Sequence, residues 1–342
     1  MGLKQIFVVP ADRRTPSGGN LYNRFLVKAL REAGVDLSVM TIDQAIRDAQ
    51  RRRPARYWLD TLLLDRIAGF RTWVRRPAEC FVIVHYFPSL QPAAQSRRRN
   101  AWRRTEDAAF RCADGFLLTS AFSARELASR NLGSKPFVVV APAPVVTPGG
   151  KAGARRPGFR ALMAGSLVSG KGILEFLEGL DRRLASDDEF SLQIAGRMDV
   201  DPSYAARCLR VVDDSAVLRH QVRFLGALGL RAMKQAYERN VFFISASKME
   251  TFGMALQEAR LFGLYVLALD AGNAASHVTS PVQGEIFASI PELSARVAHL
   301  VGNPPLRERI LGAMDPPPTP STWTQAAADF LAQVKRPYRR IP

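Results

Sequence analysis

Short apolar runs alternate with longer amphipathic segments along the whole chain, a pattern typical of α/β proteins with parallel sheets. In the first half, five apolar runs are predicted to be strands: residues 5–9, 35–42, 80–85, 115–119 and 137–140. Between them, residues 21–33 have apolar side chains at helical spacing, and residues 120–130 begin with a serine that can cap a helix. The first half is therefore predicted to be one α/β domain.

The segment at residues 58–73, WLDTLLLDRIAGFRTW, is predicted to be an amphipathic helix. Arginines flank it at residues 51–53 and 75–76, and tryptophan stands at both of its ends. A helix of this kind can lie on a membrane interface or pack against the sheet of its own domain. The sequence leaves both possibilities open.

A stretch rich in Pro, Gly and Ala at residues 141–158 is predicted to be an interdomain linker. Five further strands are predicted beyond it: residues 159–164, 190–195, 222–225, 241–244 and 265–269. Helical segments follow these strands, so the chain is predicted to fold as two doubly wound α/β domains with a cleft between them. The expected parts are an N-terminal domain at 1–142, a linker at 143–158, a second domain at 159–318 and a terminal helical segment at 319–342.

Residues 240–272 concentrate the candidate chemistry. A strand, a polar loop, a helix at 253–262 and a second strand follow one another, so the two strands are expected to be parallel neighbours. Ligands of such sheets bind at the carboxyl ends of the strands, where this loop lies. Glu250 lies in the loop and Glu258 in the helix, and the helix N-terminus between them can bind an anion.

Other predicted strands of the second half also end in a glycine or a charged residue. These ends are expected to share one edge of the sheet: Gly165 with Lys171, Gly196 with Arg197, Gly226 and Gly272. Lys171 and the N–H groups of residues 252–254 can together hold a diphosphate without a metal ion. Glu258 can then accept two ribose hydroxyls, and Glu250 can face a sugar attached to the diphosphate.

Each of these residues also has an ordinary structural interpretation. Glu250 and Glu258 can be solvated charges, and Lys171 a surface lysine. His85, at the carboxyl end of the predicted strand 80–85, could close the site from the first domain or be a histidine that is satisfied at the end of its strand. Gly18-Gly19 can be a tight turn, because neither a GxGxxG nor a GK[ST] motif is present. The placement of several such residues on corresponding strand ends is what favours a functional site.

The formal net charge of +17 is concentrated in the first half. Residues 1–150 hold 24 of the 48 Lys and Arg residues but 12 of the 31 Asp and Glu residues. This asymmetry indicates either an anionic partner, such as a membrane surface or nucleic acid, or a solvated basic surface. Arginines are densest around Trp102, at residues 97–99 and 103–104.

Three cysteines without CxxC spacing predict neither a disulfide framework nor a zinc site, which suits a reducing cytoplasm. No apolar stretch reaches the roughly 18 residues of a membrane span, and the apolar run near Met1 is too short for a signal peptide. His220, His277 and His299 share no metal-ligand spacing. The sequence therefore predicts a soluble or peripheral cytoplasmic protein without a metal site.

The run from Glu250 to Glu258, ETFGMALQE, resembles the E-x7-E motif of retaining GT-B glycosyltransferases, particularly family 4. Upstream, Gly165-Ser166-Leu167 with Gly170-Lys171-Gly172 is similar to the GR-L…KG segment of that family. Val222–Gly226 keeps the family order, whereas the first half resembles it loosely, at Gly18-Gly19 and His85. The resemblance implies a GT-B fold of two Rossmann-like domains, with the C-terminal helix crossing back to the N-terminal domain.

The resemblance also implies roles for individual residues. Donor binding is implied for Gly18, Gly19, Ser166, Lys171, Gly196, Arg197, Leu225, Glu250, Thr251, Phe252, Gly253, Met254 and Glu258. In catalysis, Glu250 is implied to bind sugar hydroxyls near the anomeric centre, Lys171 to neutralise the departing diphosphate, and His85 to contact the sugar. One position departs from the family: its arginine is Ser166 here, and Arg197 is a candidate substitute.

These implications predict a retaining, metal-independent glycosyltransferase with a UDP- or GDP-sugar donor and no cofactor. Its acceptor is expected to be a glycan or a lipid-linked molecule in cell-envelope polysaccharide or glycolipid synthesis, at the inner face of the membrane. Ser166 motivates one alternative, a catalytically silent GT-B protein that acts as a scaffold or partner. The arginines around Trp102 motivate another, a nucleic-acid-binding protein, although no DNA- or RNA-binding module is present.

Overall fold

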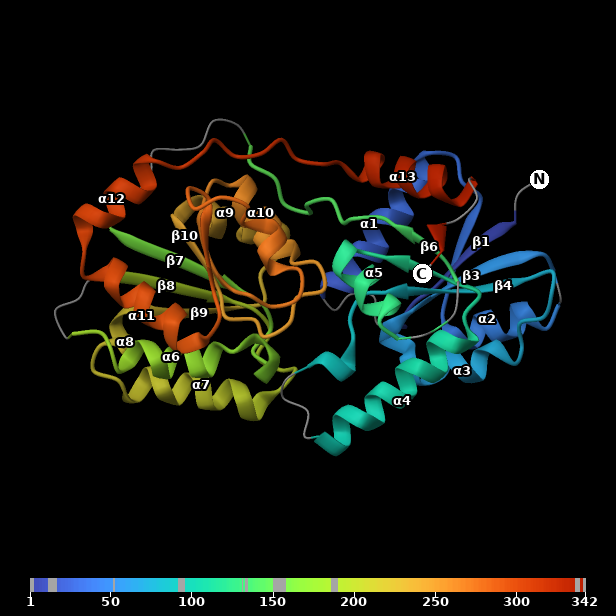
Figure 1. Ribbon diagram of the computed structural model, residues 1–342, viewed down its shortest axis with the longest axis horizontal. Helices are drawn as coiled ribbons and strands as arrows, with labels where there is room; N and C mark the ends of the chain where they lie inside the picture. The colour runs from blue at the N-terminus through green and yellow to red at the C-terminus, as the bar shows by residue number, and fades with distance from the viewer. Residues whose placement is uncertain are drawn as a thin grey trace. The chain divides into compact units, whose positions relative to one another are not determined.

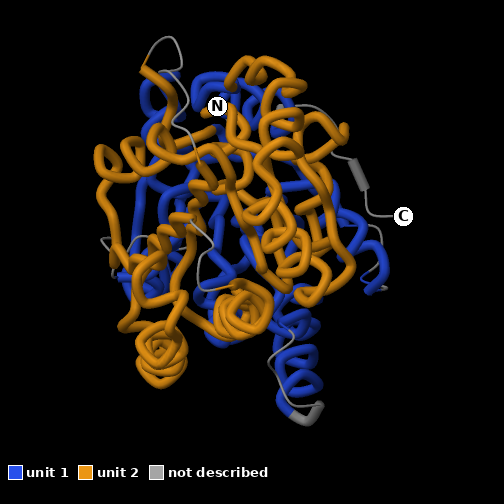
Figure 2. Tube along the Cα trace, turned by 90° about the vertical axis from the view of Figure 1, so that its left-hand side faces the viewer, with its two compact units in different colours: residues 1–143, 321–342 blue, residues 144–320 orange. Residues whose placement is uncertain are grey.

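The computed structural model describes residues 3–11, 17–51, 53–91, 96–130, 132, 135–149, 158–185, 190–335 and 339–340. The chain forms two compact units: unit 1 is residues 1–143 with 321–342, and unit 2 is residues 144–320 (Figure 2). Each unit has a parallel sheet with helices on both faces (Figure 1). The predicted α/β architecture with two doubly wound sheets is therefore confirmed.

Unit 1 has a sheet of seven strands in the order β13-β6-β5-β4-β3-β1-β2. Its strands are β1 (Lys4–Val8), β2 (Leu37–Met40), β3 (Ala55–Asp60), β4 (Glu79–Val84), β5 (Gly115–Leu118), β6 (Pro136–Val139) and β13 (Arg339–Arg340). Its helices are α1 (Gly18–Glu32), α2 (Ile42–Ala49), α3 (Leu64–Arg71), α4 (Ser96–Cys112), α5 (Ala121–Ala128) and α13 (Trp323–Lys335). Strands β1 to β6 are parallel, and the short β13 pairs with β6 in the antiparallel direction.

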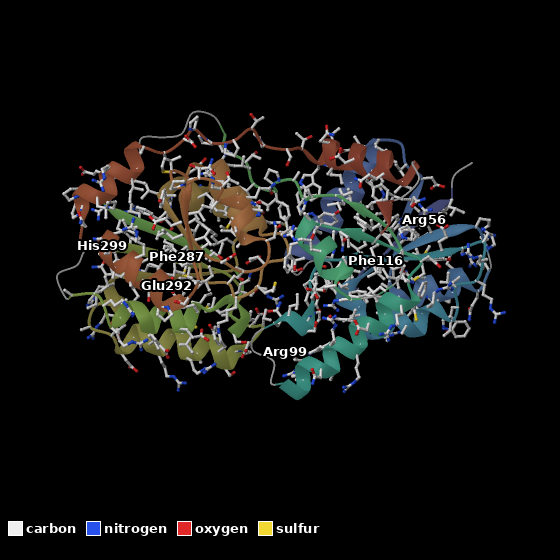
Figure 3. All side chains as sticks on the ribbon, viewed as in Figure 1. Arg56, Arg99, Phe116, Phe287, Glu292 and His299 are labelled. Carbon is white, nitrogen blue, oxygen red and sulfur yellow. The ribbon has the colours of Figure 1, made fainter. Side chains whose placement is uncertain are left out.

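Two apolar layers hold the helices of unit 1 to its sheet. On one face, Leu26 of α1 and Phe330 of α13 pack against Trp58 of the sheet. On the other face, the apolar sides of α2 to α5 cover residues that include Phe116 of β5 (Figure 3). Because both faces are covered, the strands between them carry nearly continuous apolar runs, as expected for a parallel sheet.

The prediction of a helix over residues 58–73 is wrong in its first part. Residues 55–60 form β3, which pairs with β1 and β4, and the helix begins only at Leu64. A strand buried on both faces lacks polar alternation, and a short apolar run of this kind cannot be distinguished from a buried helix by periodicity. Arg56 at the start of β3 (Figure 3) bonds Glu79 of β4 through its Nε, at 2.6 Å.

The terminal helix α13 belongs to unit 1, as the predicted GT-B fold requires. It packs against α1, where the rings of Trp323 and Phe25 are stacked with centroids 5.5 Å apart. Gln333 bonds both backbone groups of Val139: its Oε1 accepts from the amide at 3.0 Å and its Nε2 donates to the carbonyl at 2.8 Å. The helix is thereby tied to the end of β6.

Unit 2 has a parallel sheet of six strands in the order β12-β11-β10-β7-β8-β9. Its strands are β7 (Phe159–Ala164), β8 (Phe190–Ala195), β9 (Val222–Gly226), β10 (Phe242–Ser245), β11 (Tyr265–Leu269) and β12 (Gly284–Phe287). Its helices are α6 (Ile173–Asp181), α7 (Pro202–Asp214), α8 (Leu218–Gln221), α9 (Leu230–Arg239), α10 (Met254–Leu261), α11 (Ile290–Val301) and α12 (Pro304–Gly312). The five predicted strands are all present, whereas β12 has no counterpart in the sequence prediction.

The two faces of this sheet are also covered. Helices α6, α7, α8 and α11 pack on one face, around a core that includes Phe176 and Leu293. Helices α9 and α10 pack on the other, around a core that includes Tyr237 and Leu256. The predicted parallel pairing of β10 and β11 is confirmed, with Phe242 opposite Tyr265.

Candidate active site

The carboxyl ends of the unit 2 strands meet at one edge of the sheet, and glycines let their backbones pack closely there. A Cβ on Gly196, just after β8, would lie 1.8 Å from the carbonyl oxygen of Gly165, just after β7. Gly272, just after β11, has a φ of +63°, and a Cβ there would lie 2.2 Å from the carbonyl oxygen of Glu250. These glycines are therefore required by close backbone contact rather than by an open turn.

Lys171 and Glu250 are brought together at this edge. The Lys171 Nζ lies 2.5 Å from the Glu250 Oε1 and 3.3 Å from the Ser247 Oγ. Lys171 lies in a 3-10 turn, η3 (Ser169–Lys171), and Gly172 after it has a left-handed φ of +62°. A Cβ on Gly172 would lie 2.3 Å from the Ala246 carbonyl oxygen, so this glycine lets η3 approach the loop that carries Glu250.

The pair is partly exposed: the exposed fractions of the side chains are 31% for Lys171 and 17% for Glu250. An ion pair this exposed contributes little to folding, about 0–1 kcal/mol. Its cation and carboxylate therefore remain accessible to an incoming ligand.

The loop that carries Glu250 is held from behind by a short turn after β11, η4 (Ala274–His277). The Asn273 amide donates to the Glu250 carbonyl at 2.7 Å, and its side-chain Nδ2 donates to the Phe252 carbonyl at 2.9 Å. The His277 Nε2 lies 2.6 Å from the same Phe252 carbonyl oxygen, and burial lowers the pKa of His277. A neutral imidazole that donates this hydrogen bond fixes the loop without adding a charge.

Sequence reasoning missed the role of Asn273, whereas His277 holds the loop and so has the structural role expected of it. His277 was interpreted as structural because it shares no metal-ligand spacing with another histidine, and Asn273 was not considered. The available signal was their position, since both follow the strand β11 that neighbours the loop.

Helix α10 begins directly after Glu250 and its loop. Gly253 is the N-cap with a φ of +94°, and no side chain caps the helix. Its first N–H groups, at Met254 and the next two residues, have no carbonyl acceptor within the helix. They lie at the positive end of the helix dipole, which favours an anion.

Glu258 lies one turn into α10, and its carboxylate is already bonded by three groups of the protein. The Oε1 accepts from the backbone amides of Val145 and Val146 at 2.9 and 3.1 Å, and the Oε2 accepts from the Tyr237 hydroxyl at 3.1 Å. The residue is 7% exposed, and burial raises its pKa against the lowering effect of these hydrogen bonds. A ribose would have to share this carboxylate with the three donors.

The remaining predicted donor residues of unit 2 lie near the ends of β7, β8 and β9. Arg197 donates from its Nε and Nη2 to the two carboxylate oxygens of Asp199, at 2.8 and 2.7 Å. Its backbone carbonyl accepts from the Leu167 amide at 2.8 Å, so Arg197 lies beside the loop that contains Ser166. Leu225 is partly buried on β9, and Thr251 is buried next to Glu250.

In unit 1 the structure brings Gly19 and His85 into contact. A Cβ on Gly19, in the first turn of α1, would lie 3.0 Å from the Cδ2 of His85. Gly18 is the first residue of the same helix, behind the cap formed by Ser17. The His85 Nε2 lies 3.1 Å from the Asn23 Oδ1 and 3.4 Å from the Asp60 Oδ2. Neither Asn23 nor Asp60 is among the predicted site residues, and Asp60 lies in the segment that the sequence assigns to a helix.

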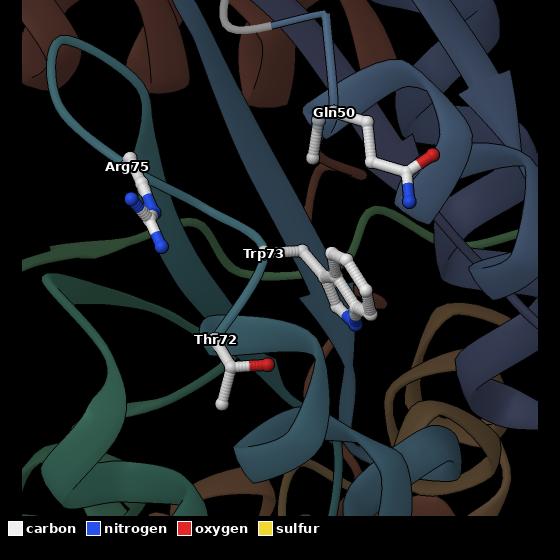
Figure 4. A pocket seen from close by; sticks show the side chains of 5 residues that line it. Gln50, Thr72, Trp73 and Arg75 are labelled. Atoms are coloured by element: carbon white, nitrogen blue, oxygen red, sulfur yellow. The ribbon is translucent and has the colours of Figure 1, made fainter.

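A separate hollow of about 340 Å³ lies in unit 1 (Figure 4). It is lined by Ala49, Gln50, Thr72, Trp73 and Arg75. Trp73 is 47% exposed, which is unusual for a large apolar side chain. The flanking Arg51, Arg53 and Arg76 are also exposed.

Within the described residues, no three His, Cys, Asp or Glu side chains are arranged to hold a metal ion. Over the same residues, no helix combines the length and apolar character that crossing a membrane requires.

Two Rossmann-like units, with the last helix returned to the first, define the GT-B fold. Solved structures agree with this assignment. Sucrose-phosphate synthase from Thermosynechococcus elongatus superposes with a TM-score of 0.77 at 16% identity, covering 98% of each chain. HepE from Anabaena, in complex with UDP and glucose, gives 0.68 at 16% identity and covers 95% of each chain. The lipopolysaccharide outer core galactosyltransferase WaaB gives 0.65 at 14% identity, covering 97% of this chain and 98% of WaaB.

The sequence of unit 2 carries the more specific match. Residues 151–311 match the family described as glycosyl transferases group 1. This range contains Lys171, Glu250 and Glu258. No curated protein matches the chain. The family match thus lies within unit 2, and the solved structures share the GT-B fold of the whole chain.

Proposed function

We propose that the protein is a retaining, metal-independent glycosyltransferase of family 4, which transfers a sugar from a nucleotide diphosphate sugar to an acceptor. The observation that carries the proposal is the Lys171–Glu250 pair, 2.5 Å apart and directly before the N-terminus of α10. The Lys171 cation and the first amides of α10, which have no acceptor within the helix, suit the diphosphate of such a donor. The Glu250 carboxylate suits the hydroxyls of the sugar near its anomeric carbon.

In this proposal the diphosphate binds at the α10 N-terminus and draws the Lys171 ammonium away from Glu250. Lys171 then stabilises the negative charge that grows on the diphosphate as the glycosidic bond breaks. Glu250, released from its ion pair, accepts hydrogen bonds from sugar hydroxyls. Catalysis thus rests on positioning and on charge stabilisation.

Ser166 stands where the family has an arginine, and Arg197 is our candidate for its replacement. The Arg197 backbone is bonded to the neighbouring Leu167, and its side chain is 24% exposed. Its partner Asp199 is 70% exposed, so a diphosphate would compete with a weak surface ion pair. Glu258, Gly196, Leu225 and residues 251–254 keep their proposed roles in donor binding, and Gly18, Gly19 and His85 are proposed to contact the donor from unit 1.

The first experiment is a thermal-shift screen against UDP-, GDP-, ADP- and dTDP-sugars, because a bound donor raises the melting temperature. We expect a UDP- or GDP-sugar to give the largest shift. The responding donor is then used to compare Glu250→Ala with Glu308→Ala, an exposed glutamate of α12 that serves as control. Loss of turnover in the first variant alone supports the site, and wild-type turnover in both rejects it. The anomeric configuration of the product, read by NMR, tests the retaining mechanism.

We further propose a glycan or lipid-linked acceptor in cell-envelope polysaccharide or glycolipid synthesis, reached from the cytoplasmic face of the membrane. The supporting observation is the exposed Trp73 among exposed arginines of a basic unit. Tryptophan and arginine together suit the interface of an anionic bilayer.

Liposome sedimentation with and without anionic lipid tests this membrane contact. We expect salt-sensitive binding that Trp73→Ala weakens and that Leu230→Ala does not; Leu230 is a 41% exposed residue of unit 2. Equal sedimentation with neutral and anionic liposomes would refute the contact.

The alternatives make different forecasts. A silent GT-B scaffold, motivated by Ser166, would bind a partner without turning over any nucleotide sugar. A nucleic-acid binder would need Trp102 as a stacking surface, whereas Trp102 packs partly buried against the core of unit 1.

A further inference from the structure

His85 is held by a buried chain of polar groups that leads back to Asp60. Asp60 is completely buried at the end of β3. Its Oδ1 accepts from the Leu62 backbone amide at 2.7 Å, and its Oδ2 accepts from the Asn23 Nδ2. The Asn23 Oδ1 in turn lies 3.1 Å from the His85 Nε2. The His85 backbone is fixed as well, since its amide donates to the Thr61 hydroxyl at 3.0 Å.

This chain determines which way the Asn23 amide faces. An ionised carboxylate can only accept hydrogen bonds, so the Asn23 atom that meets Asp60 must be the NH₂ group. The carbonyl oxygen of the same amide is then the atom that meets His85. A reversed amide would place the Asn23 oxygen against the Asp60 carboxylate, and two acceptors that face each other in the interior cannot form a hydrogen bond.

The orientation of Asn23 in turn determines the tautomer of His85. An amide oxygen can only accept, so the His85 Nε2 must carry the proton. In the neutral imidazole the other nitrogen, Nδ1, is then a bare acceptor. Among the described residues, Nδ1 has no hydrogen-bond partner. Gly19 contacts the ring at its Cδ2–Cγ edge, and the side chain keeps an exposed fraction of 6%.

We infer that Asp60 and Asn23 are positioning residues, which hold a proton on the His85 Nε2, so that Nδ1 of the neutral ring accepts a hydrogen bond from a substrate hydroxyl. The inference rests on the proposed function, in which His85 contacts the sugar. It adds a direction to that contact: His85 accepts, and the hydroxyl donates. Asp60 and Asn23 act through His85, since both are buried, with exposed fractions of 0% and 5%.

The tautomer can be reversed by one isosteric substitution. In Asp60→Asn, the Leu62 amide still needs an acceptor, so the new amide oxygen takes the place of Oδ1 and its NH₂ group faces Asn23. Asn23 must then turn its oxygen toward residue 60 and its NH₂ group toward His85. The His85 Nε2 becomes the acceptor, and the proton moves to Nδ1.

Exchanging the two residues should restore the original tautomer. In the double variant Asn23→Asp with Asp60→Asn, the amide at position 60 donates to the carboxylate at position 23. The other oxygen of that carboxylate again accepts from the His85 Nε2. Asp65→Asn, at an exposed position of α3, is the matched control for a loss of charge.

The test is ¹⁵N NMR of the imidazoles in ligand-free protein in mildly alkaline buffer, where nitrogen shifts separate a protonated from a bare ring nitrogen. The chain has four histidines, and the spectrum of a His85→Gln variant identifies the His85 signals. We expect Nε2–H in the wild type, in Asp65→Asn and in the double variant, and Nδ1–H in Asp60→Asn. A wild-type His85 that is protonated at Nδ1, or unchanged in Asp60→Asn, would overturn the inference.

The kcat/KM values of the same variants provide a second test. We expect Asp60→Asn to lower kcat/KM about threefold to tenfold, the effect of one neutral hydrogen bond, and the double variant to recover it. The thermal shift produced by free nucleotide should not change. The NMR experiment uses no sugar donor, so it determines the tautomer of His85 even if the wild type turns over no nucleotide sugar. Absence of turnover would reject only the proposed function.

Discussion

Replacing Glu258 by alanine tests whether this carboxylate has a structural role beside any role in ribose binding. The substitution removes the acceptor for the Val145 and Val146 amides and for the Tyr237 hydroxyl. Val146 and Tyr237 are buried, whereas Val145 is half-buried and its amide can be hydrated. The Tyr237 hydroxyl also lies 3.4 Å from the Ala255 carbonyl and can shift its hydrogen bond there.

The Val146 amide is therefore the donor that loses its partner completely. A buried donor without an acceptor costs about 1–3 kcal/mol, and the lost side-chain packing adds to this. We expect Glu258→Ala to reduce the free energy of unfolding by roughly 2–4 kcal/mol. For a unit of this size, each kcal/mol corresponds to about 2–4 °C, so the melting transition should fall by roughly 4–16 °C.

Calorimetry of ligand-free protein measures this change, with the exposed Glu308→Ala as control. Glu258→Gln is the informative second variant, because its amide oxygen can still accept from both backbone amides and its NH₂ group can bond the tyrosine oxygen. We expect it to retain nearly all of the stability. A loss below about 0.5 kcal/mol in Glu258→Ala would refute the structural role, since exposed surface substitutions alone have effects of that size.

Three further outcomes follow from the site. Burial raises the pKa of Glu258, so protonation of this carboxylate stabilises the folded state. The stability of the wild type relative to Glu258→Gln should therefore be largest below about pH 4.3 and should fall as the pH rises through the pKa of Glu258 in the folded protein. Paired urea titrations of the two proteins measure this difference. Gly196→Ala should destabilise unit 2 by about 1–3 kcal/mol in thermal melts because its Cβ meets the Gly165 carbonyl at 1.8 Å, whereas Gly229→Ala has open space. Lys171→Met should lower donor turnover about 10- to 150-fold, while the free energy of unfolding falls by less than about 1 kcal/mol. Lys234→Met, which removes a lysine that pairs with Glu238 on α9, is the control and should leave turnover unchanged.

Most of unit 2 could be predicted from the sequence because its strands are short apolar runs with glycine or a charged residue at their ends. The same rule placed Lys171 and Glu250 at one sheet edge, where the structure has them 2.5 Å apart. Strand β12 was missed because only Ile286 and Phe287 are apolar in it, next to Gly284 and Glu285. Such an edge strand is defined by its pairing with β11, which local sequence does not encode.

The failure at β3 had a larger consequence for the site. Asp60 ends that strand, and once residues 58–73 are assigned to a helix, this carboxylate becomes an ordinary helix residue. Its partner Asn23 lies 37 residues away on α1, so only the folded sheet brings the two together. Polar chains of this kind depend on three separate elements meeting, which periodicity cannot predict.

The same distinction explains why Glu258 has a different environment from the one expected. Its spacing from Glu250 is a local property of the loop and the first turn of α10. Its partners Val145 and Val146 come from a segment more than 100 residues earlier. Because the carboxylate holds that segment to α10, a ligand that binds Glu258 would also act on the start of unit 2. Donor binding and the anchoring of residues 145–146 would then compete for, or share, the same two oxygens, and comparing donor affinity in Glu258→Gln with its stability separates the two roles.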